Sequence, residues 1–87
     1  MKEMVPIVLP DLGTDWVTLS AWYVHPGERV YAGDRVAEVL IPGATVDIAA
    51  PIDGVLVQRQ VGVDQRLAPG SILGYLSPSI AGEEPSQ

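Results

Sequence analysis

Residues 17–39 read VTLSAWYVHPGERVYAGDRVAEV, and residues 54–76 read GVLVQRQVGVDQRLAPGSILGYL. The two stretches carry one pattern twice, with an offset of 37 positions. Most of the matched pairs are apolar residues at the spacing of strands or glycines at turns: Leu19 with Leu56, Val24 with Val61, Arg29 with Arg66, Val30 with Leu67, Gly33 with Gly70, Val36 with Leu73 and Val39 with Leu76. An internal repeat of this length in a chain of 87 residues predicts two similar halves packed face to face.

Glycines and prolines interrupt the chain at short, regular intervals, so no window of helical length is free of them. The runs between them are rich in Val, Ile, Leu, Thr and Tyr, which is typical of an all-β sandwich or barrel. Eight strands are expected, four on each side of a central Pro42-Gly43 turn: Val5–Leu9, Val17–Val24, Arg29–Tyr31, Val36–Ile41, Ala44–Ala50, Val55–Val61, Arg66–Ala68 and Ile72–Ser77. We expect one domain over residues 5–77, a frayed N-terminus over residues 1–4 and a flexible polar tail over residues 78–87.

The composition argues against several classes of function. The sequence has no cysteine, which excludes disulfides and thiolate metal sites, and a single histidine, His25, cannot form a metal site alone. A net charge of −6 with only five Lys and Arg disfavours nucleic acids and anionic membranes, which bind clustered cations. No apolar run approaches the roughly 20 residues that cross a bilayer. Since Pro6 and Pro10 also interrupt any signal-like start, we expect a cytoplasmic monomer.

A two-residue loop at Pro42-Gly43 sets the register of the central hairpin. Because side chains alternate between the two faces of a strand, one face collects the core residues Val39, Ile41, Ala44, Val46 and Ile48. The other face collects Glu38, Leu40, Thr45 and Asp47, so that two like charges lie opposite each other and Leu40 points into water. Gly43 would supply the positive φ of a type II turn.

Four stretches together carry a resemblance to a known family: VLPDLG at residues 8–13, WYVHPGERV at 22–30, AGDRVAEV at 32–39, and ATVDI at 44–48 continuing through Ala50-Pro51 to Gly54, with Gly70 and Leu73–Leu76 closing it. They resemble the lipoyl domain of 2-oxo acid dehydrogenase acyltransferase components, within the biotinyl/lipoyl attachment family. The resemblance covers residues 5–77. It implies a flattened barrel of two four-stranded antiparallel sheets related by a quasi-two-fold axis, and a domain that is not itself an enzyme.

In the family that this chain resembles, a lysine at the hairpin tip is joined to lipoate or biotin through an amide. Alignment through Glu38-Val39 and Ala44-Thr45-Val46 puts Gly43 at the lysine position, so no lipoate or biotin cofactor is expected there. Two hypotheses follow. The first is a non-catalytic binding or assembly module. The second is a swinging-arm carrier of a 2-oxo acid dehydrogenase or carboxylase-type complex, modified at an unforeseen site; Lys2 supplies the single side-chain amine.

The candidate contacts for a protein partner are Trp16, Leu40, Pro42 and Gly43. Trp16 ends a loop that is shorter than in the family, and an exposed aromatic residue is a common interface anchor; the alternative is that Trp16 covers one open end of the barrel. Leu40 is either a contact or an ordinary exposed apolar residue, and Pro42-Gly43 is either a binding tip or simply a tight turn. No catalytic residues and no metal ligands are expected, because one turn histidine and dispersed carboxylates supply neither a triad nor a paired acid and base.

Overall fold

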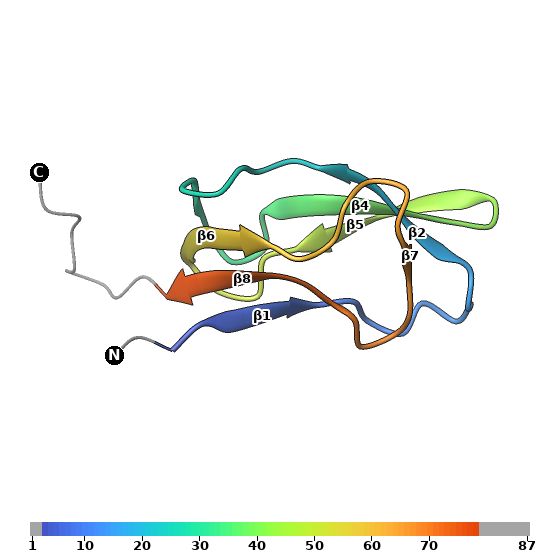
Figure 1. The fold of residues 1–87 in the computed structure, drawn as a ribbon, viewed down its shortest axis with the longest axis horizontal. Helices are drawn as coiled ribbons and strands as arrows, with labels where there is room; N and C mark the ends of the chain where they lie inside the picture. The colour runs from blue at the N-terminus through green and yellow to red at the C-terminus, as the bar shows by residue number, and fades with distance from the viewer. Residues whose placement is uncertain (1–2, 79–87) are drawn as a thin grey trace, which may run out of the picture.

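The computed structural model describes residues 3–78, which form eight β-strands (Figure 1). The strands are β1 (Val5–Val8), β2 (Val17–Trp22), β3 (Arg29–Val30), β4 (Arg35–Ile41), β5 (Ala44–Ala49), β6 (Gly54–Arg59), β7 (Arg66–Leu67) and β8 (Ile72–Pro78). All eight expected strands are confirmed. The strand β8 extends through Pro78, one residue into the expected tail, while residues 1–2 and 79–87 lie outside the described part. Within residues 3–78, no helix is long and apolar enough to cross a membrane.

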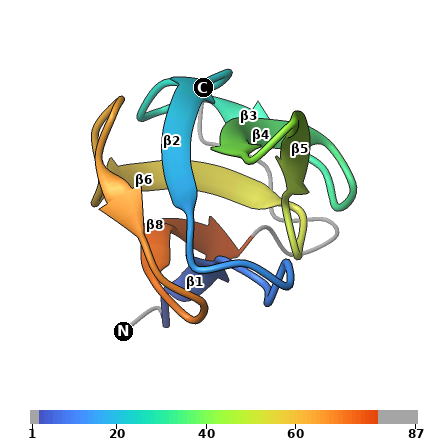
Figure 2. The ribbon, with the colours of Figure 1, turned by 90° about the vertical axis from the view of Figure 1, so that its right-hand side faces the viewer.

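The strands form two four-stranded sheets with antiparallel pairing. Sheet A has the order β1-β8-β6-β3, and sheet B has the order β5-β4-β2-β7. Figure 2 shows the two sheets closing around a common interior, with β1, β8 and β6 on one side and β2, β4 and β5 on the other. The expected all-β fold of two four-stranded antiparallel sheets is confirmed.

The two halves of the chain interlock instead of stacking as separate layers. The central strands of sheet A, β8 and β6, come from the second half, and its edge strands, β1 and β3, come from the first. Sheet B has the reverse arrangement. The expectation of two halves packed face to face was therefore wrong in this respect. The repeat shows which strands are equivalent, but it does not show which strands pair.

The repeat extends to the hydrogen bonds of the turns. The amide of Glu28 donates to the carbonyl of His25, and 37 positions later the amide of Gln65 donates to the carbonyl of Gly62. The side chains follow the same rule, because the Glu28 carboxylate accepts from the His25 amide and the Gln65 side-chain oxygen accepts from the Gly62 amide. His25 is thus an exposed residue whose backbone is held in a turn, as expected.

The core consists of the repeated apolar residues. Four matched pairs are each at most 4% exposed: Leu19 with Leu56, Val30 with Leu67, Val36 with Leu73 and Val39 with Leu76. The other buried apolar residues are Ile7, Leu9, Val17, Ala37, Ile48 and Ala50. Half-buried side chains such as Val24 and Val61, a further matched pair, pack around this cluster. The burial of both members of each pair explains why the repeat keeps apolar residues at these positions.

The central hairpin has the predicted register. Glu38 lies opposite Asp47, Leu40 opposite Thr45 and Ile41 opposite Ala44, and Gly43 has a φ of +79° in the turn. Burial falls towards the tip: Val39 and Ile48 are buried, Ile41 and Val46 are half-buried, and Ala44 is exposed. The tip therefore extends beyond the core, as the hairpin between β4 and β5 shows at the right of Figure 1.

Candidate functional site

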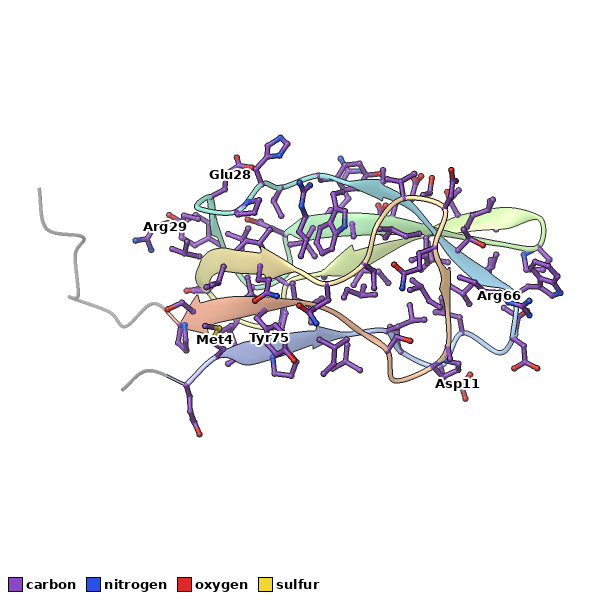
Figure 3. All side chains as sticks on the ribbon, viewed as in Figure 1. Met4, Asp11, Glu28, Arg29, Arg66 and Tyr75 are labelled. Atoms are coloured by element: carbon purple, nitrogen blue, oxygen red, sulfur yellow. The ribbon has the colours of Figure 1, made fainter. Side chains whose placement is uncertain are left out.

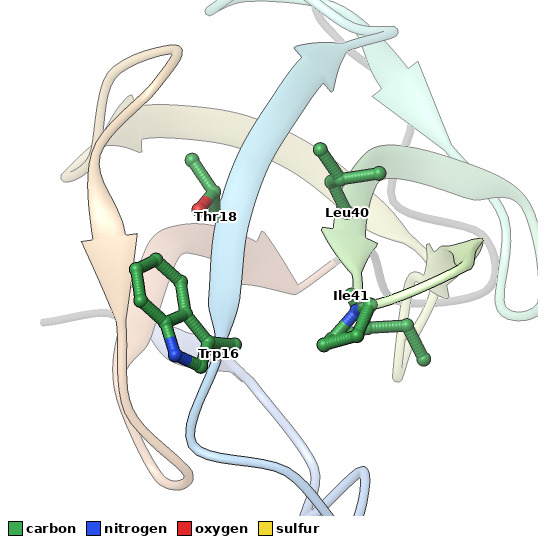
Figure 4. Close-up of a pocket in the computed structure, with 5 residues that line it drawn as sticks. Trp16, Thr18, Leu40 and Ile41 are labelled. Atoms are coloured by element: carbon green, nitrogen blue, oxygen red, sulfur yellow. The ribbon is translucent and has the colours of Figure 1, made fainter.

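A shallow pocket lies where the central hairpin meets the start of β2 (Figure 4). It has a volume of about 230 Å³ and is lined by Trp16, Thr18, Leu40, Ile41 and Pro42. We call this pocket the hairpin groove. Three of the four predicted contact residues, Trp16, Leu40 and Pro42, come together there, and Gly43 follows Pro42 at the tip without lining the groove.

The loop before β2 is fixed by local hydrogen bonds. The carboxylate of Asp11 accepts from the amide of Gly13 at 2.9 Å, and the hydroxyl of Thr14 accepts from the amide of Trp16 at 3.0 Å. Side-chain oxygens that bond two residues ahead are typical of tight turns. Trp16 is 59% exposed, and the residue of this loop that packs against the core is Leu12. The indole therefore stands largely on the surface.

One face of the Trp16 ring is occupied by a cation. The guanidinium carbon of Arg66 lies 4.1 Å from the ring centroid, within the range of a cation–π contact. Arg66 belongs to β7 and lies opposite Thr18 of β2. The pairing of β7 with β2 therefore places Arg66 beside Trp16. Figure 3 shows Arg66 at the end of the molecule from which the hairpin projects. The groove is thus apolar with a guanidinium at its margin.

The internal symmetry provides a comparison for Leu40 and Trp16. Thr18 pairs with Leu40 in sheet B, and the equivalent pair in sheet A is Val55 with Ser77. The residue equivalent to Trp16 is Asp53, whose carboxylate accepts a hydrogen bond from the Ala32 amide at 2.8 Å. Because the same fold accommodates Ser77 and Asp53 at these positions, the architecture does not require Leu40 or Trp16 to be apolar.

Beyond the groove, the outer face of sheet B is polar. Glu38 accepts hydrogen bonds from the hydroxyls of Ser20 at 2.9 Å and Tyr23 at 3.0 Å. Asp47 pairs with Arg35 at 3.4 Å, and the Arg35 guanidinium lies 5.0 Å from the Tyr23 ring centroid. The hydrogen bond to Glu38 raises the pKa of Tyr23 above its usual value, with smaller contributions from desolvation and from the negative charges of Glu38 and Asp47. These contacts balance the like charges of Glu38 and Asp47, which the sequence left unexplained.

Two of the groove residues were not among the predicted contacts. Thr18 joins the groove because β2 pairs with β4, a contact that local sequence does not reveal. Ile41 was assigned to the core face, and it reaches the groove because the core ends before the hairpin tip. The position of Ile41 next to the turn was the feature of the sequence that could have indicated its place in the groove. Among residues 3–78, no group of three or more His, Cys, Asp or Glu side chains could hold a metal ion.

The fold and this hairpin match a known family. A family model described as "Biotin-requiring enzyme", of the biotin/lipoyl type, matches residues 5–76. The chain belongs to this family. The match confirms the resemblance to the biotinyl/lipoyl attachment family that the sequence indicated.

A curated relative is a component of an enzyme complex. The dihydrolipoyllysine-residue succinyltransferase component of 2-oxoglutarate dehydrogenase complex 1, mitochondrial, from Arabidopsis thaliana is 39% identical over 56 residues, or 61% of this chain. The match spans 12% of that relative's length. Among solved structures, the lipoyl domain of the 2-oxoglutarate dehydrogenase complex from Azotobacter vinelandii has a TM-score of 0.68, covering 84% of this chain and 95% of that chain. At 21% identity, this likeness concerns the fold.

The hairpin tip does not fit a prosthetic group joined through an amide to a side chain. Pro42 and Gly43 carry no side-chain amine, and the single lysine of the sequence, Lys2, lies outside the described residues. What the hairpin end offers instead is an exposed apolar surface beside a guanidinium.

Proposed function

We propose that this biotin/lipoyl domain is a non-catalytic binding or assembly module, which contacts a protein partner through the hairpin groove and carries no prosthetic group at its tip. The observation that carries the proposal is the pairing of an amine-free Pro42-Gly43 tip with an exposed apolar groove at the same end. In the lipoyl domains that this chain resembles, the attachment lysine lies at this end, beside the loop before β2, which helps the partner enzymes recognise the domain. In this proposal, the domain still recognises a partner protein but carries no attached lipoate or biotin.

The exposure of Leu40 and Trp16 supports this proposal. Leu40 is 50% exposed and Trp16 is 59% exposed, although the equivalent positions in the other sheet carry Ser77 and Asp53. Single exposed apolar residues are common, but Trp is enriched among the residues that anchor protein contacts, and here Trp16 lines the same groove as Leu40. We propose that the partner is a protein, not a nucleic acid or a membrane, and that the domain acts as a cytoplasmic monomer.

Cross-linking pull-downs from the native host test the binding role. The variants are the double substitution Trp16→Ala with Leu40→Ser, and the control Val57→Ser. Val57 is also an exposed apolar strand residue, 38% exposed, and its equivalent in the other half is Ser20. We expect the wild type and Val57→Ser to recover the same partner, and the double variant to lose it. Recovery of no specific partner by the wild type, or its undiminished recovery by the double variant, contradicts the proposal.

A second candidate follows from family membership. In this alternative, the protein is a swinging-arm carrier of a 2-oxo acid dehydrogenase or carboxylase-type complex, with lipoate or biotin attached at an unforeseen site, for which Lys2 supplies the single side-chain amine. Intact mass measured on protein purified from its own organism decides between the two functions. An added mass of one lipoyl or biotinyl group that disappears in a Lys2→Arg variant supports the carrier, whereas unmodified mass throughout rules it out.

A further inference from the structure

The hairpin groove and Arg66 together specify the chemistry of what binds there. We propose that the groove takes one large apolar side chain of a partner protein segment, and that Arg66 binds a carboxylate next to that side chain. This inference rests on the proposed binding function and adds the recognition chemistry to it.

The size of the groove points to a single side chain. Pockets for cofactors and drug-sized molecules usually measure about 300–1,000 Å³, and the groove measures about 230 Å³. Its lining is dominated by the indole of Trp16 and the aliphatic side chains of Leu40 and Ile41. Such walls favour a side chain the size of Leu or Phe, whose burial would remove apolar surface on both partners from water.

Arg66 is positioned to bind a carboxylate. Its guanidinium is stacked on the ring of Trp16. Among residues 3–78, the guanidinium forms no ion pair with a carboxylate. Arg35 differs, because it combines a stacking contact with an ion pair to Asp47. Stacking fixes the plane of a guanidinium and leaves its edge donors accessible, and that edge is the geometry that binds carboxylates in a bidentate manner. Pre-ordering of the donor also lowers the entropy lost on binding.

The equivalent positions at the other end of the molecule carry different side chains. The residue equivalent to Arg66 is Arg29, which lies opposite Val55 in the same register that places Arg66 opposite Thr18. There, however, Asp53 takes the place of Trp16 and Ser77 takes the place of Leu40. Figure 3 shows the two arginines near opposite ends of the molecule. The combination of Trp16, Leu40 and Arg66 is therefore specific to the hairpin end and does not follow from the repeat.

Charge limits the partner further. The chain has a net charge of −6, so a segment with many acidic residues would be repelled. A single carboxylate beside an apolar side chain gains the local contact with Arg66 and incurs little of the general repulsion. The preferred ligand is thus a mainly apolar segment with one acidic group.

Two small probes separate the apolar contact from the charge contact. N-acetyl-L-leucine presents one apolar side chain and one carboxylate, and N-acetyl-L-leucinamide presents the same side chain without the charge. Each is titrated at millimolar concentration into the ¹⁵N-labelled protein, and two-dimensional amide spectra are recorded. We expect saturable shifts at residues 16–18, 40, 41 and 43, with the carboxylate probe binding at least about threefold more tightly, since its carboxylate adds a charge-assisted hydrogen bond to the guanidinium.

Three variants complete the test. Arg66→Gln should abolish the difference between the two probes, Leu40→Ser should weaken both, and Val57→Ser should match the wild type. Equal affinity of the wild type for both probes, a preference that survives Arg66→Gln, or the absence of saturable shifts at the groove overturns the inference. Loss of the inference and loss of the proposed function are distinguishable. If recovery of the partner depends on Trp16 and Leu40 but not on Arg66, the proposed binding function stands and the proposed carboxylate contact is wrong.

Discussion

Gly74 lies against the indole of Trp22: a Cβ atom on Gly74 would stand 3.3 Å from Cη2 of that ring and 2.6 Å from the carbonyl oxygen of Gln58. Trp22 is anchored on its other side, because its Nε1–H donates to the carbonyl of Val61 at 3.0 Å. The residue equivalent to Gly74 in the first half is Ala37, which is fully buried. A side chain at position 74 would thus meet both the backbone of β6 and the indole of Trp22, which reaches across from sheet B towards sheet A.

Substitution of Gly74 by Ala should destabilise the protein. The added methyl group meets backbone as well as the indole, so the strand must shift, and overpacking of this kind typically costs about 1–3 kcal/mol. Urea unfolding measures the loss, and Trp fluorescence reports the displaced indole. Gly62→Ala is the control, because a Cβ there meets nothing within 4 Å, and it should be neutral or slightly stabilising. Equal stability of the two variants would show that β8 can shift at Gly74 at no cost, and would contradict the prediction.

Leu76 and Leu40 should respond very differently to truncation, although both are leucines in strands. Leu76 is 0% exposed, and Leu76→Ala should lower the free energy of unfolding by about 2–5 kcal/mol. Leu40 is 50% exposed, and Leu40→Ser should change it by less than about 0.5 kcal/mol. Chemical denaturation with an unchanged slope checks both values. A large destabilisation by Leu40→Ser would mean that Leu40 serves the fold, which would remove a main support of the binding role.

A lysine at the hairpin tip should be tolerated. In Gly43→Lys combined with Pro42→Asp, the new Cβ meets nothing within 4 Å, but the φ of +79° is a left-handed conformation that costs an L residue about 1–2 kcal/mol. We expect the folded double variant to be modified by a lipoate ligase, as intact mass will show. The control is Gly33→Lys, which places a lysine in another open, positive-φ turn away from the tip and should stay unmodified. A folded but unmodified double variant means that the tip differs from a lipoyl hairpin in more than its missing amine.

The hydrogen bond from Tyr23 to Glu38 should be visible in a pH titration. Because the bond to the Glu38 carboxylate raises the pKa of Tyr23 in the folded state, folding favours the protonated phenol. The stabilisation is therefore fully present below the usual tyrosine pKa of about 10 and is lost as the pH rises through the raised value. NMR of the ¹³C-labelled tyrosine ring follows the titration. Glu38→Gln should bring the Tyr23 pKa back towards its usual value, whereas an unchanged pKa would deny Glu38 this role.

The fold was predictable because its determinants are local or repeated. The register of the central hairpin follows from the alternation of Val39, Leu40 and Ile41 and from a turn that needs the positive φ of Gly43. The buried pairs follow from the repeat itself. The interlocking of the halves was not predictable in the same way, because a repeat identifies equivalent strands and leaves open which strands of the two copies form hydrogen bonds.

The candidate site was predictable only in part. Trp16 and Leu40 were recognisable as apolar residues at exposed positions, but their neighbours Thr18 and Arg66 arrive through the pairing of β2 with β4 and β7. Likewise, the like charges of Glu38 and Asp47 looked unfavourable because their partners Tyr23, Ser20 and Arg35 are remote in sequence or at a bulge. Each missing contact depends on which strands are neighbours, and that information is absent from any short window of sequence.

The interlocked sheets have a consequence for how the protein can come apart. Since each sheet takes two strands from each half, neither half could form a complete sheet by itself, and the molecule corresponds to a strand-swapped dimer whose two subunits have been joined into one chain by the Pro42-Gly43 turn. Unfolding of either half would strip the edge strands from the other half's central pair. The hairpin end is accordingly stabilised by strands from both halves. Its surface residues can therefore vary without loss of the fold.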